Sequence, residues 1–158
     1  MAVRLSTGFA SAILGPNSFE SLFQYGAIEI RSGAQPASAD AAATGSLLGR
    51  ITTGGGAWTA GSPTNGLVIV RDGRLVRKNP PDSWVLAGSA TGTAGWFRWV
   101  TNVPDAGGYS TSAIRIDGAI GLTDATGDYQ LFLPTLSLTS SSNHTIADWW
   151  YSLPPLGA

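Results

Sequence analysis

The sequence predicts a mostly β fold: an antiparallel β-sandwich or jelly roll with a short helical N-terminal segment. Short apolar runs alternate with polar residues at a period of two, which is typical of half-buried strands. Turn signals recur about every 8–12 residues, as in all-β sandwiches. The 158-residue chain contains 21 glycines, enough for many tight turns, and its length fits one domain.

Residues 1–26 are predicted to form the helical segment, ahead of a β-sandwich domain over residues 27–158. Ser6 is placed to cap a first short helix, in which apolar residues recur at helical spacing until Gly15. Ser18 is placed to cap a second helix, whose apolar residues share one face. We therefore expect two short helices packed on the domain or on a neighbour.

The β domain begins at residues 27–31, where Ile28 and Ile30 point to one face of a predicted strand. Asp72-Gly73 lies between two β-branched runs, and this arrangement is a strong signal for a β-hairpin. Asp117-Gly118 is read in the same way, as a turn between two strands. Further strands are expected over 47–53, 83–86, 95–103, 112–116, 129–138 and 145–153.

The chain is poor in charge, with 12% charged residues and a formal net charge of −1. This is about half of the ~25% that is usual for a globular domain. Either small polar residues cover the surface, or part of the surface is hidden against other subunits, and we favour the second option. The net charge gives no reason to expect a nucleic acid or an anionic membrane as partner.

The sequence has no cysteine, so disulfides and thiolate metal sites are excluded. A reducing compartment fits this absence. No segment reaches the ~20 consecutive apolar residues of a membrane span. Residues 1–15 lack the continuous apolar run of a secretory signal, so none is expected.

His144 is the only histidine, with Asp148 four residues later and three serines at 140–142 just before it. A Ser-His-Asp set can be drawn from these residues. However, a catalytic triad is assembled from separate parts of a fold, and a serine-rich stretch beside a histidine is usually a turn. We therefore predict no catalytic residue and no enzyme activity.

Asp124 and Asp128 flank a short polar stretch that has some resemblance to a calcium loop. Calcium takes six to eight oxygen ligands, and this stretch lacks the length and the closing glutamate of an EF-hand. Aspartates in such a stretch more often bond their own backbone in a turn. No metal site and no cofactor are predicted.

Tryptophan is abundant, with six residues in the chain. In the strand over 96–100, Phe97 and Trp99 point to one face, and Trp96, Arg98 and Val100 to the other. Both faces are therefore apolar or amphipathic. The second face either lies under a loop or the N-terminal helices, meets another subunit, or forms a platform for sugar rings. The candidate interface residues are Trp96, Arg98, Trp99, Trp149, Trp150, Phe19 and Phe23.

Four stretches together resemble a group of small proteins encoded among the structural genes of tailed bacteriophages: residues 4–8, 27–40, 44–49 and 91–98. The resemblance covers most of residues 4–121 and carries no catalytic motif; the stretch from Tyr129 resembles nothing specific. It implies a virion component that decorates the capsid or builds part of the tail or its fibres.

Such a protein would be made in the host cytoplasm and would assemble with itself and with capsid or tail subunits. The alternative is a carbohydrate-binding module that contacts the host surface. Neither reading involves nucleic acid or a membrane.

Overall fold

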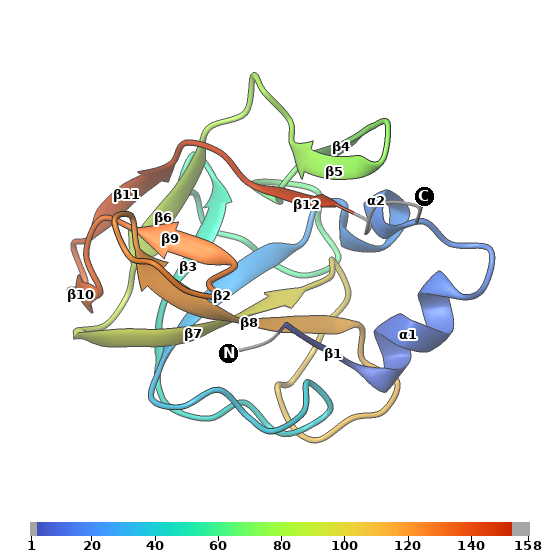
Figure 1. The fold of residues 1–158 in the computed structure, drawn as a ribbon, viewed down its shortest axis with the longest axis horizontal. Coiled ribbons are helices and arrows are strands. Elements are labelled where there is room, and N and C mark those ends of the chain that lie inside the picture. The colour runs from blue at the N-terminus through green and yellow to red at the C-terminus, as the bar shows by residue number, and fades with distance from the viewer. Residues whose placement is uncertain (1–2, 153–158) are drawn as a thin grey trace.

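The computed structural model of the chain describes residues 3–152 as a mostly β fold with two short helices near the N-terminus (Figure 1). The predicted fold class is therefore confirmed. The helices are α1 (Thr7–Ile13) and α2 (Phe19–Phe23). The strands are β1 (Arg4–Leu5), β2 (Ala27–Ser32), β3 (Leu47–Thr53), β4 (Ile69–Asp72), β5 (Leu75–Lys78), β6 (Trp84–Gly88), β7 (Gly92–Val100), β8 (Arg115–Leu122), β9 (Leu131–Leu133), β10 (Ser137–Leu138), β11 (Asn143–Ile146) and β12 (Trp150–Ser152).

These strands form two sheets, an arrangement consistent with a β-sandwich. The larger sheet has the order β1-β8-β7-β2-β3-β6-β11, with β10 paired to β7 and β9 running parallel to β8. The smaller sheet has the order β12-β5-β4. Its β4–β5 hairpin confirms the turn predicted at Asp72-Gly73, where Gly73 takes a left-handed φ of 59°.

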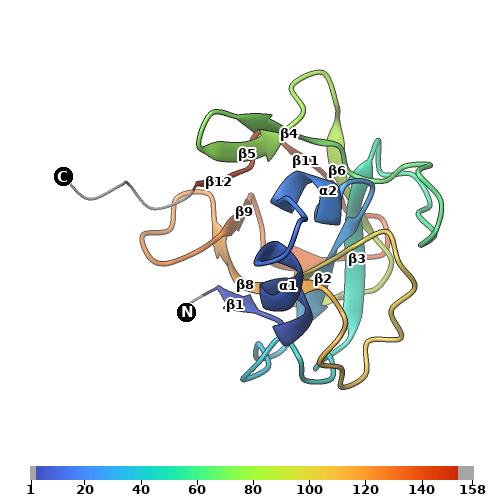
Figure 2. The same ribbon diagram turned by 90° about the vertical axis from the view of Figure 1, so that its right-hand side faces the viewer.

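Side-chain caps begin both helices. The Ser6 hydroxyl accepts a hydrogen bond from the backbone N–H of Phe9, and Ser18 forms a reciprocal capping box with Ser21. The helices lie at one end of the molecule, in front of the sheets in Figure 2. Three buried phenylalanines from this end, Phe9, Phe19 and Phe23, join the same hydrophobic core as the strands. Residues 3–26 are thus an integral part of the domain.

The core lies on the face of the larger sheet to which Ile28, Ile30 and Trp99 point. Trp99 lies edge-on to Trp149 with a ring-centroid distance of 4.5 Å, and Phe23 is 4.9 Å from Trp99. Aromatic pairs in this geometry are stabilising beyond the area that they bury. This cluster joins the helices, the larger sheet and the chain that leads into β12.

The turn predicted at Asp117-Gly118 is wrong, because both residues lie inside β8. Gly118 is opposite Phe97 in the β7–β8 ladder, and a Cβ atom at this position would lie only 2.5 Å from the Phe97 ring. The glycine therefore makes room for an aromatic ring. Asp117 is buried against Arg98, a long-range partner that the local sequence does not reveal.

None of the helices within residues 3–152 has the length and apolarity needed to cross a bilayer.

Candidate functional site

The face of the larger sheet opposite the core carries a row of alternating charges. The strand registers place Arg50, Glu29, Arg98, Asp117 and Arg4 opposite one another on β3, β2, β7, β8 and β1. Each charge therefore has opposite charges as its cross-strand neighbours. Such pairs stabilise a sheet directly, whereas like charges in these positions would repel.

Two carboxylates hold this row together. Asp117 accepts a bidentate pair of 2.8 Å hydrogen bonds from Nε and Nη2 of Arg98, and both side chains are almost completely buried. Glu29 accepts from Arg31 at 2.8 Å through one oxygen and from Arg50 at 2.9 Å through the other. Bidentate guanidinium–carboxylate pairs are geometrically specific, so they fix the register of the strands.

Two loops cover the charged row. From the loop of residues 33–46, the carbonyl of Ala41 accepts a 3.1 Å hydrogen bond from Nη2 of Arg98. From the loop of residues 101–114, Asp105 binds Arg115 through bonds of 2.6 and 2.5 Å. The backbone N–H of Ala43 also donates to the carbonyl of Gly107, which ties the two loops to each other. Both loops thus pack against the arginines of these ion pairs.

The carboxyl groups on this side respond differently to their surroundings. Burial raises the pKa of Asp117, although hydrogen bonding and charge from Arg98 oppose it. Burial acts in the same direction on Asp105, but the bonds from Arg115 and the Gly107 N–H outweigh it and lower the pKa. Hydrogen bonds from the Thr7 side chain and backbone lower the pKa of Asp40. Arg115 therefore holds Asp105 in its charged form.

Six of the seven candidate interface residues are buried inside this chain. They are Trp96, Arg98, Trp99, Phe23, Phe19 and Trp149, each at most 9% exposed. Phe19, Trp99 and Trp149 nevertheless line the apolar groove described below. Trp150 is 60% exposed and is the most accessible of the seven.

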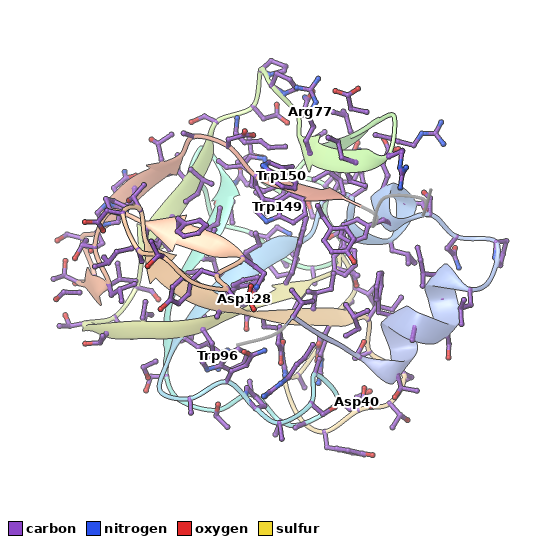
Figure 3. The ribbon with its side chains drawn as sticks, viewed as in Figure 1. Asp40, Arg77, Trp96, Asp128, Trp149 and Trp150 are labelled. Atoms are coloured by element: carbon purple, nitrogen blue, oxygen red, sulfur yellow. The ribbon has the colours of Figure 1, made fainter. Side chains whose placement is uncertain are left out.

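The two faces predicted for the strand over 96–100 are both present. Phe97 and Trp99 belong to the hydrophobic core, whereas Trp96 lies outside that cluster, with the guanidinium of Arg98 5.4 Å from its ring centre. Figure 3 shows Trp96 and Asp40 on the loop side of the sheet, away from Trp149 and Trp150. Of the three readings of the second face, cover by a loop of the same chain is the one that the structure shows.

The exposed Trp150 stands at the largest cavity described, an apolar groove of about 530 Å³. Phe97 and Trp99 are part of its lining, and β9 and β12 contribute residues to its walls. Phe132 on β9 is 42% exposed. We call this feature the aromatic groove. Sequence reasoning identified Trp150 but missed Phe132, because a single phenylalanine in a short run gives no sign of its exposure.

Two strands with an unpaired edge line the aromatic groove. β12 is the outer strand of the smaller sheet, and β9 pairs only with β8 among the described residues. An edge strand offers free backbone N–H and C=O groups to another chain. The groove therefore combines apolar surface with open hydrogen-bonding edges.

The residues considered for catalysis do not come together. His144 lies in β11, and its Nε2 atom is buried without a hydrogen-bond partner. Asp148 accepts a bond from the backbone N–H of Trp149 and makes no hydrogen bond to His144. Within residues 3–152, no group of three histidine, cysteine or acidic side chains is placed to hold a metal ion.

No protein-family model, curated protein or solved structure matches the chain. The resemblance to bacteriophage structural proteins stays a prediction, and the geometry of the domain is the basis for a proposal of function.

Proposed function

We propose that this protein is a non-enzymatic structural component of a tailed bacteriophage virion, a β module that assembles with itself and with capsid or tail subunits. The observation that carries the proposal is the aromatic groove, with the exposed Trp150 beside it and the strands β9 and β12 along its walls. The virion context comes from the sequence resemblance.

The groove has the properties of an assembly surface. Exposed apolar surface that is gathered around a cavity is typical of protein interaction sites. Tryptophan is among the residues that contribute most to binding when a partner covers it. The unpaired edges of β9 and β12 would let a neighbouring subunit add backbone hydrogen bonds to this apolar contact.

The low charge of the chain supports the same proposal. Much of the charge on the larger sheet is used inside the molecule, in the ion pairs of Glu29 and Asp117 beneath the loops. A module with few surface charges has little electrostatic repulsion to overcome when many copies pack side by side.

The test is the mass of the protein in solution, measured by light scattering together with thermal melting. Trp150→Ala should lower the oligomer mass and leave the melting temperature nearly unchanged, because the side chain is 60% exposed. Tyr109→Ala is the matched control, since Tyr109 is 75% exposed and lies outside the groove lining. A wild-type protein that is monomeric at high concentration and does not bind virions lacking it would contradict the proposal.

Carbohydrate binding at the host surface is the second candidate, because an exposed tryptophan ring beside a groove can also stack on a sugar ring. In this case Trp150→Ala would keep the wild-type mass and lose retention on a polysaccharide column. This outcome would replace the first proposal.

A further inference from the structure

A second cavity lies on the opposite side of the larger sheet from the aromatic groove. It encloses about 170 Å³ between the polar face of β2, β3 and β7 and residues of the two segments 58–60 and 103–107. We call it the guanidinium cavity. Its charged lining consists of Glu29, Arg31, Arg50, Arg98 and Asp105.

The hydrogen-bond acceptors of this cavity are already occupied. The two oxygens of Glu29 accept from Arg31 and Arg50, and both oxygens of Asp105 accept from Arg115. These carboxylates therefore have little remaining capacity to receive a donor from a ligand.

Several arginine N–H donors, in contrast, have no acceptor within the described part of the chain. The Nη1 atom of Arg98 has no hydrogen-bond partner among the described residues, but it is buried and therefore closed to an incoming ligand. Arg31 and Arg50 each use Nε and Nη2 on Glu29, and no hydrogen bond within residues 3–152 takes their Nη1 atoms. The side chains of Arg31 and Arg50 are 15% and 40% exposed, so these two donors are accessible to a ligand that brings acceptors.

The charges around the cavity also favour an anionic ligand. Four guanidinium groups, those of Arg31, Arg50, Arg98 and Arg115, lie in or beside the cavity with three carboxylates. The cavity is thus net positive, which favours a ligand with a carboxylate or phosphate group.

The cavity also has an apolar wall and a solvent-facing cation. Trp58 and Val103 line it, and the guanidinium of Arg50 lies 5.9 Å from the centre of the Trp58 ring. The Arg50 side chain is 40% exposed, so a ligand can reach it from solvent. The volume is well below the about 300–1,000 Å³ of pockets for drug-sized molecules. The ligand must therefore be small.

We propose that the guanidinium cavity binds the oxyanion of a small ligand, a carboxylate or a phosphate, with the accessible guanidinium groups of Arg31 and Arg50 as donors. This inference is independent of the assembly proposed for the aromatic groove, because the two sites lie on opposite faces of the sheet. An acidic monosaccharide and inorganic phosphate represent the two sources of such an oxyanion.

Isothermal titration calorimetry with glucuronate, phosphate and glucose tests the proposal. At least one of the two anions should bind saturably, and the tighter of the two identifies the source. Glucose is the matched control because it keeps the sugar ring and lacks the carboxylate, and it should not bind. If neither anion binds up to about 10 mM, where the free energy of binding would be under 3 kcal/mol, or if glucose binds equally well, the proposal is overturned.

Three variants locate the binding. Arg50→Gln should weaken anion binding about tenfold or more, because a charge-assisted hydrogen bond is lost. Glu29→Gln should strengthen it, since a negative charge leaves the cavity. Arg71→Gln removes the same charge from the exposed β4 and should have no effect. Equal losses in Arg50→Gln and Arg71→Gln would mean nonspecific attraction and would refute the site.

Discussion

Replacing Asp117 by asparagine keeps the shape of this buried side chain and removes its charge. Arg98 would then remain 1% exposed with no carboxylate bonded to it, and one of its two 2.8 Å hydrogen bonds would lose its acceptor. Breaking a buried ion pair from one side typically costs about 3–5 kcal/mol. Because asparagine retains one acceptor oxygen, we expect a loss of about 3 kcal/mol, or about 6–12 °C in melting temperature for a chain of this size.

The measurement is urea denaturation at pH 7 followed by circular dichroism, supported by thermal melts. Asp72→Asn is the control, because the Asp72–Arg77 pair is 56% and 41% exposed and should contribute under about 1 kcal/mol. A double variant, Arg98→Met with Asp117→Leu, should recover most of the loss, since burial already raises the pKa of Asp117 and the pair itself is costly to bury. If Asp117→Asn costs no more than Asp72→Asn, the ion pairs do not support the loop-covered face.

Three further perturbations follow from the packing. Arg115 and the Gly107 N–H lower the pKa of Asp105, so its carboxylate stabilises the folded protein fully above the ordinary pKa of 3.8. This stabilisation is lost as the pH falls through the lower pKa of the folded protein. Asp105→Asn should therefore flatten the loss of stability in acid, in denaturation measured from pH 5 to 2. Gly118→Ala should destabilise the fold by about 1–3 kcal/mol through a clash with the Phe97 ring, and an unchanged urea midpoint would disprove that contact. Ser6→Ala should cost about 1–2 kcal/mol, because the helix cap is lost, and equal stability in the two proteins would show that this cap is dispensable.

Local chemistry explains why the sequence predicts some elements well. The caps at Ser6 and Ser18 and the turn at Gly73 depend on residues within a few positions of one another. Each of these signals acts through the backbone of its own segment, so no knowledge of the tertiary fold is needed.

The candidate sites depend on strand register instead. Asp117-Gly118 has the local pattern of a turn, but its conformation is set by Arg98 and Phe97 on the neighbouring strand. Likewise, nothing near Trp96 in the sequence shows that a loop from residues 33–46 covers its face of the sheet. Pairings between residues far apart in the chain decide which aromatic side chains are exposed, and one sequence alone does not specify them.

The strand order also determines when the domain can fold during translation. β2 is paired on one side with β7, and β1 with β8, so the partner of Arg4 is synthesised more than a hundred residues later. At about 5–20 residues per second, the ribosome needs about 5–20 s to bridge this interval. For the first part of that time, until β7 has been made, Ile28 and Ile30 lack the strand that will cover one edge of β2. Nascent chains should therefore be most prone to aggregation, and most in need of chaperones, before β8 has left the ribosome.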